Sequence, residues 1–291
     1  MSPARRDGLA PPRAVRSRTE RRVRNAVALG ACAAAAGVLL VPIALLVAQL
    51  VGRGLPALRP GFFVHMPKPV GEPGGGMANA IVGTLILIAL AAAFALPVGV
   101  GAGVYLAEFG ESRLASALRY VADVLGGVPS IVVGVAVYGL IVVPMGHFSA
   151  LAGGLALGIL MLPTIVRSTE EVVRLVPQSY RHAALALGAP RWRVVQQIVL
   201  PAARGGIATA ALLAVARASG ETAPLLFTAL GNRFWSTRLD QPIASLPMMI
   251  YDYARAPYPD WNAQAWTGAL VLFLMIAVLA AATRWTTRRI R

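Results

Sequence analysis

Residues 124–166 read VLGGVPSIVVGVAVYGLIVVPMGHFSALAGGLALGILMLPTIV, a run of 43 residues without a formally charged side chain. A helix that crosses a bilayer needs about 20 apolar residues, so this run is too long for one helix. The segment PMGH at residues 144–147 divides it into two stretches of about 20 residues, each long enough to span a membrane. The run therefore predicts two membrane-spanning helices joined by a tight hairpin.

Further apolar runs of similar length lie outside this segment and bring the predicted spans to six. They are residues 25–51, 77–107, 205–230 and 261–283. The sequence thus predicts an all-α fold, a polytopic membrane helix bundle with six transmembrane helices. Its predicted parts are a basic disordered tail at 1–24, a first transmembrane helix at 25–52, a core at 77–285 with a polar loop at 167–204, and a C-terminal tail at 286–291.

The composition supports a membrane location. Hydrophobic residues make up 57% of the chain and charged residues 13%, against roughly 45–50% and 25% in soluble domains. This excludes an ordinary soluble enzyme, a disordered protein and a disulfide scaffold, and Cys32 has no second cysteine to pair with. The only lysine, Lys68, lies between two prolines, so the chain has no nucleotide-binding P-loop. If ATP is used, another chain must bind it.

The basic residues indicate the orientation. The net charge is +15, and the arginines flank apolar runs instead of forming a stripe on a polar domain. This pattern favours a lipid bilayer over nucleic acid as the partner. The two tails and the even-numbered loops hold 20 Lys and Arg residues, and the odd-numbered loops hold 6. Because positive charge is retained in the cytoplasm, we expect a multi-pass protein of the bacterial plasma membrane with both termini cytoplasmic.

Small residues in the second run indicate how it packs. Gly99, Gly101 and Gly103 follow Pro97 within an apolar stretch. No soluble βαβ context surrounds them, so they are not a dinucleotide-binding fingerprint. Glycines at this spacing predict close packing of helices in the bilayer.

Residues 179–201 predict a helix, a sharp turn and a second helix on the cytoplasmic side. Ser179 is a candidate N-cap. Gly188 suits the left-handed residue after a helix, and Pro190 suits the first turn of the next one. Residues 180, 183, 184 and 187 share one apolar face at helical spacing. Two interpretations stay open on this evidence: a helix lying on the membrane surface, and a helix that docks in the groove of a partner.

The segment HAALALG at 182–188, followed by Leu200 and Pro201, resembles the Glu-Ala-Ala loop of ABC importer permeases. His182 stands where that family usually has glutamate. In the family this loop forms the cytoplasmic coupling helix, which sits in a cleft of the ATP-hydrolysing subunit. The resemblance implies that the residues coupling this chain to an ATPase are His182, Ala183, Ala184, Leu187 and Gly188.

Three other segments, 127–134, 216–230 and 234–247, resemble the permeases of bacterial phosphate ABC importers. The resemblance extends over about residues 77–285. It implies a transport subunit that binds no cofactor itself, with ATP and Mg on a partner ATPase. The implied partners are a homologous permease (PstC), an ATPase dimer (PstB), a periplasmic phosphate-binding protein (PstS) and inorganic phosphate.

Two charges interrupt the fifth run. Arg217 and Glu221 are four residues apart, which predicts that they share one helix face. Charges within a span cost a few kcal/mol and mark functional pathways by default. Pro224 cannot donate to the carbonyl of Gly220, so a helix break is expected here. The pair either holds the bundle together as an ion pair, or Arg217 faces the transport route and binds phosphate oxygens with Glu221 beside it.

The remaining polar residues predict no catalytic or metal site. Asp123 follows Arg119 by four residues and is expected to pair with it near the membrane interface. His65, His147 and His182 are scattered and have no metal-ligand spacing. Two alternatives to a phosphate permease stay open: an ABC permease for another oxyanion or solute, and a secondary transporter that works alone.

Overall fold

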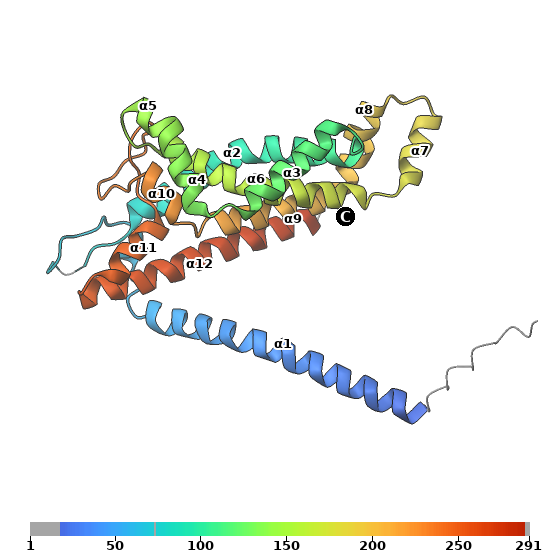
Figure 1. The fold of residues 1–291 in the computed structure, drawn as a ribbon. Helices are drawn as coiled ribbons and strands as arrows, with labels where there is room; N and C mark the ends of the chain where they lie inside the picture. Colours follow the sequence, from blue (N-terminus) through green and yellow to red (C-terminus); the bar gives the residue numbers. More distant parts are fainter. Residues whose placement is uncertain (1–17, 73, 289–291) are drawn as a thin grey trace, which may run out of the picture. The chain divides into compact units, whose positions relative to one another are not determined.

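The computed structural model describes residues 18–72 and 74–288 (Figure 1). Within these residues the regular structure is helical, apart from an isolated bridge between Leu230 and Ile243. The chain divides into two units, 1–49 and 50–291. The first unit holds most of α1 (Arg18–Gly54), which begins seven residues before the predicted span. Residues 1–17 of the predicted basic tail and residues 289–291 of the C-terminal tail lie outside the described residues.

Five helical segments of the described chain are long and apolar enough to cross a membrane, and a bent helix pair brings the number to six. This confirms the predicted all-α class. The segments are Arg22–Gly54, Ala78–Glu108, Ala150–Arg174, Arg191–Ala218 and Pro259–Thr283, and the bent pair is Arg113–Gly127 with Ser130–Met145.

The bent pair corrects the predicted third span. Helix α3 (Arg113–Gly127) begins in the stretch between the predicted second and third spans, where the Ser112 side chain accepts a hydrogen bond from the Ala115 amide at 3.0 Å. The chain then turns by 106°, because Pro129 disfavours helical geometry in the residue before it. The span after the bend is α4 (Ser130–Val137), continued by η2 (Tyr138–Val142) and α5 (Val143–Met145). The predicted hairpin follows, with Gly146 at φ 74°.

Helices α2 (Ala78–Glu108) and α6 (Ala150–Arg174) form the centre of the second unit and run parallel. The two helices can pack this closely because glycines at their contact leave room for atoms of the facing helix. A Cβ on Gly99 would lie 2.7 Å from Ile165 Cγ2, and one on Gly103 would lie 2.6 Å from Thr169 Cβ. Close helix packing is thereby confirmed at Gly99 and Gly103, whereas Gly101 has no atom within 4 Å of its Cβ position.

The rest of the second unit packs around this pair. The fifth segment consists of α8 (Arg191–Val194), η3 (Val195–Val199) and α9 (Leu200–Ala218), and α9 packs on α6. Helix α9 ends at Ala218, twelve residues before the end of the predicted apolar run at 205–230. The short α10 (Ala223–Thr228) packs on α4, and α11 (Leu246–Arg255) packs on α12 (Pro259–Arg288).

The loop at 229–245 closes the N-terminal end of α6. The amides of Ser149, Ala150 and Leu151 donate hydrogen bonds of 3.0 Å each to the carbonyls of residues 228, 241 and 239. These bonds satisfy amides that a helix start leaves without intrahelical partners. In the same loop, the Arg238 guanidinium lies 2.7 Å from the Asp240 carboxylate and holds the pKa of that carboxyl below its ordinary value.

Candidate transport and coupling sites

Arg217 and Glu221 do not lie on one helix face, which corrects the prediction. Arg217 is the second-last residue of α9, and Glu221 lies in the break before α10. Arg217 is exposed and Glu221 is half-buried. In the part of the chain that the structure describes, no ion pair joins these two side chains. The interpretation as an intrahelical ion pair therefore loses its geometric basis.

Between α9 and α10 the chain is not helical at residues 219–222, and Gly220 lies in this break. The Glu221 amide bonds the Ala218 carbonyl at 3.1 Å in a turn, and Pro224 lies in the first turn of α10. Proline suits that position because its missing amide would have no partner there. A largely apolar hollow of about 440 Å³ lies beside the break, bordered by Gly220, Thr222 and side chains of α11 and α12.

Arg217 adjoins the hydrophobic core of the bundle. Its neighbours Ala214, Val215 and Ala218 belong to the same buried cluster as Met161 of α6. A guanidinium in the middle of an apolar bundle is stable only where it meets water, an anion or a polar partner. Its exposure in this chain thus points to a polar route or a subunit interface on this side of α9.

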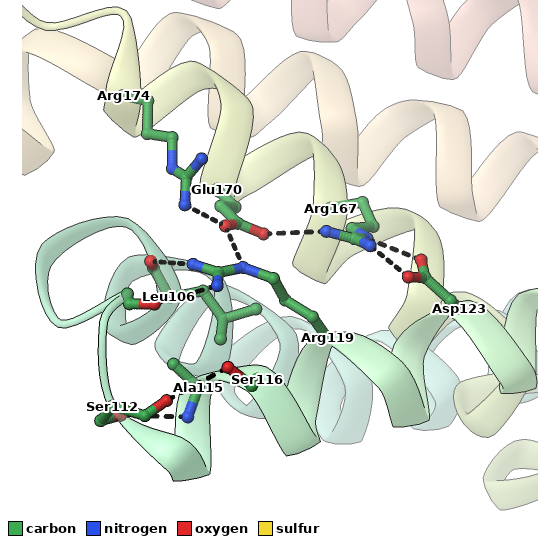
Figure 2. Close-up of polar contacts among 10 residues, drawn as sticks. Leu106, Ser112, Ala115, Ser116, Arg119, Asp123, Arg167, Glu170 and Arg174 are labelled. Atoms are coloured by element: carbon green, nitrogen blue, oxygen red, sulfur yellow. Dashed lines mark hydrogen bonds and ion pairs between the residues drawn. The ribbon is translucent and has the colours of Figure 1, made fainter.

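At the other end of α6, Glu170 is buried and accepts contacts from three arginines (Figure 2). Its oxygens lie 2.7 Å from Arg119 Nε, 2.7 Å from Arg174 and 3.3 Å from Arg167. Arg167 also binds both oxygens of Asp123. Asp123 therefore pairs across to α6, and the expected pairing with Arg119 on its own helix is wrong.

Arg119 also reaches the end of α2. Its guanidinium donates to the carbonyls of Leu106 and Gly110 at 3.0 Å each. Leu106 and Arg119 are both labelled in Figure 2. One side chain of α3 thus connects the carboxylate of α6 with a carbonyl in the last turn of α2 and one just after it.

The coupling segment is α7 (Gln178–Ala186), with Pro177 at its N-cap. The candidate N-cap Ser179 lies one residue inside the helix, because Pro177 already supplies the extended residue before it. Gly188 takes φ 81°, as its predicted place after the helix requires. The buried residues of α7 are Arg181 and Ala184.

Most of the predicted apolar face of α7 remains uncovered. Tyr180 is 57% exposed and Leu187 is 89% exposed, and Ala183 and His182 are also exposed. His182 borders a cavity of about 210 Å³ together with Gln178, Arg191 and the end of α2. Apolar side chains left on a short exposed helix favour docking to a partner over packing within the chain.

Arg181 anchors α7 to the bundle. Its Nη2 lies 2.8 Å from Oε1 of Glu108, the last residue of α2, and Nε donates to the same oxygen at 3.0 Å. It also donates to the carbonyls of Val173 and Val176 at the end of α6. Sequence reasoning did not single out Glu108, Glu170 or Arg181. The available signal was the position of both glutamates at the cytoplasmic ends of predicted out-to-in spans.

A family model described as "Binding-protein-dependent transport system inner membrane component" matches residues 99–291. The chain belongs to this family. Its members are transport components of the membrane and the family is not one of enzymes. Within the described residues, no group of three or more His, Cys, Asp or Glu side chains could hold a metal ion.

Relatives in this family include proteins named "Phosphate transport system permease protein PstA". The protein of Yersinia pestis is 47% identical over 79% of this chain and 78% of its own length. That of Xylella fastidiosa (strain Temecula1) is 46% identical over 81% and 82%. PstA 1 of Mycobacterium tuberculosis (strain CDC 1551) is 38% identical over 93% and 92%.

Among solved structures, a chain of the MetNI methionine ABC transporter in an inward-facing conformation is similar in fold. The TM-score is 0.62 at 19% identity, and the match covers 74% of this chain and 97% of that one. The predicted resemblance to ABC importer permeases is thereby confirmed in both sequence and fold.

Proposed function

We propose that this chain is a permease subunit of an ATP-driven phosphate importer. The observation that carries the proposal is the identity of 46–47% to PstA proteins of two organisms over about four fifths of the chain. The exposed Arg217 beside a helix break supports an anionic substrate, because a guanidinium fork matches the geometry of phosphate oxygens.

The partners in this proposal follow from the family and from α7. A homologous permease, PstC, completes the transmembrane route, and a PstB dimer binds ATP and Mg. The exposed face of α7 docks on PstB, with His182, Ala183 and Leu187 at the contact and Gly188 setting the turn. PstS delivers phosphate from the periplasm, and both termini of the chain lie in the cytoplasm of a bacterial plasma membrane.

The proposed mechanism assigns separate roles to the two ends of the bundle. Closure of the ATPase dimer on ATP moves α7, and the two permeases change from inward- to outward-facing. Phosphate released by PstS then meets the Arg217 guanidinium. Glu221, in the break nearby, accepts a hydrogen bond from a protonated phosphate oxygen. Gly220 and Pro224 hold the chain in the non-helical form that this geometry needs.

Uptake of radiolabelled phosphate into proteoliposomes tests the proposal. Vesicles contain this chain with PstC and PstB, and PstS is added outside. Uptake should require both PstS and ATP in the lumen, and excess sulfate should not compete. Uptake of sulfate or another solute in place of phosphate would show a different ABC permease. Uptake driven by an ion gradient without ATP would show a secondary transporter.

A further inference from the structure

Arg119 and Arg181 make reciprocal contacts at the ends of α2 and α6. Arg119 of α3 donates to the carbonyl of Leu106 in the last turn of α2, to that of Gly110 just after it, and to the carboxylate of Glu170 on α6. Arg181 of α7 donates to the carbonyl of Val173 in the last turn of α6, to that of Val176 just after it, and to the carboxylate of Glu108 on α2. Each arginine therefore joins both central helices to a third helix.

The electrostatics of parallel helices explain the arrangement. The C-terminal end of a helix carries about half a negative charge, and its last carbonyls have no intrahelical donors. Because α2 and α6 run parallel, two such ends lie side by side with Glu108 and Glu170 near them. The side chain of Arg181 is 9% exposed and that of Arg119 is 23% exposed, so water screens these contacts only partly.

The packing of α2 against α6 also opposes sliding of one helix along the other. Cβ atoms at five glycines of this contact would approach the facing helix to under 3 Å: Gly99, Gly103, Gly153, Gly154 and Gly158. Side chains of one helix thus fill the spaces left by glycines of the other, and such interlocked packing moves as a body and does not deform continuously.

We propose that Arg181 and Glu108 are positioning residues that pass the movement of α7 to the α2–α6 pair. This inference rests on the proposed function. Only Arg181 and Ala184 of α7 are buried, and alanine has no polar group to bond either helix end. The four hydrogen bonds of Arg181 make α7 and the two helix ends one mechanical unit. Through Arg119 the same unit includes α3, which leads to the bend before α4.

The test measures the number of ATP molecules hydrolysed per phosphate imported by the reconstituted four-component complex. Arg181→Lys keeps the charge, but one ammonium group cannot bond acceptors on both helices in the geometry of a planar fork. We expect intact assembly with PstB and a rise of about fivefold or more in ATP hydrolysed per phosphate. Glu108→Gln, which keeps an acceptor oxygen, should change the ratio in the same direction by less.

Arg113→Gln is the matched control, because it removes an exposed arginine at the same end of the bundle and should leave the ratio unchanged. A wild-type ratio in Arg181→Lys would overturn the inference. So would failure of both variants to bind PstB, because the pair would then serve folding alone. Absence of ATP-driven phosphate uptake by the wild-type complex would instead overturn the proposed function.

Discussion

Gly134 of α4 and Pro224 of α10 touch backbone to backbone. A Cβ on Gly134 would lie 2.7 Å from Pro224 Cα and 3.1 Å from its carbonyl oxygen. These atoms belong to the main chain and cannot rotate away. The span after the Pro129 bend therefore packs directly on the helix that follows Glu221.

This contact predicts that Gly134→Ala destabilises the chain by about 1–3 kcal/mol, the cost of overpacking a close contact. The melting temperature of the purified complex in detergent should fall, and phosphate uptake should fall with it. Gly139 lies five residues further along the same span, and a Cβ there would have no neighbouring atom within 4 Å. Gly139→Ala should therefore behave as wild type. Equal melting temperatures for the two variants would contradict the close contact.

The turn after α7 gives a second prediction. Gly188→Val places a β-branched side chain at φ 81°, which is strained for any L-residue and most strained for valine. The variant should insert normally but bind PstB weakly or hydrolyse ATP without importing phosphate. Co-purification with PstB and the ratio of hydrolysis to uptake measure this effect. Gly205→Val is the control, because Gly205 is helical and a Cβ there would have no neighbouring atom within 4 Å. Equal PstB binding and equal hydrolysis-to-uptake ratios in the two variants would mean that α7 is only a surface helix.

The absence of an ion pair between Arg217 and Glu221 in the described chain sharpens the test of the route. Arg217→Gln should reduce phosphate uptake about tenfold or more, since a hydrogen bond to a charged group contributes about 1.5–3 kcal/mol. Assembly and basal ATP hydrolysis should persist. Arg217→Lys should retain part of the activity, because it keeps the charge and loses the fork.

Combining Arg217→Gln with Glu221→Gln should not restore uptake. A structural ion pair replaced as a unit is often tolerated, whereas a substrate contact is not. Wild-type uptake by this double variant would remove both residues from the candidate site.

The buried carboxylate of Glu170 provides a stability prediction. Glu170→Gln leaves Arg119, Arg167 and Arg174 facing each other without their shared anion. Breaking a buried charge cluster costs about 3–5 kcal/mol, so the melting temperature should drop clearly. Glu171→Gln, its exposed neighbour, should change the melting temperature little. A small effect at Glu170 would mean that water screens the cluster.

Accessibility of introduced cysteines tests the orientation, after Cys32 is replaced by serine. A cysteine at the exposed Ser179 should resist a membrane-impermeant thiol reagent in intact cells. One at Thr237, which is exposed while the neighbouring Ser236 Oγ is buried, should react. The reverse pattern would contradict the orientation inferred from the arginine counts.

Local signals were sufficient for much of the fold. Gly188 takes the left-handed conformation predicted for it, and the predicted hairpin forms at residues 144–147 with Gly146 also left-handed. Apolar length located the first, second, fourth and sixth spans, whereas the bounds of the third and fifth differ from the prediction. The 106° turn before α4 was not foreseen, because hydropathy does not report direction and a single proline in an apolar run is compatible with a kink as well as a break.

The candidate site was only partly predictable for a different reason. The break near Pro224 depends on one residue and was expected, whereas the partner of Arg181 lies 73 residues away at Glu108. Asp123 shows the same limit, since helical spacing favoured Arg119 and the folded chain offers Arg167 at 2.9 Å. Side-chain pairs between helices depend on which helix ends lie next to each other, and a single sequence does not show which ends do.

The hydrogen bonds of the first amides of α6 limit when this part of the protein can finish folding during synthesis. Residues 149–151 donate to carbonyls at positions 228–241, which the ribosome adds roughly 80–90 residues later, on the order of 5–20 s at ordinary elongation rates. During that interval the first amides of α6 can form none of these three bonds. The start of α6 is thus closed only after the fifth span has been synthesised, so maturation of this part of the bundle waits on a later segment of the nascent chain.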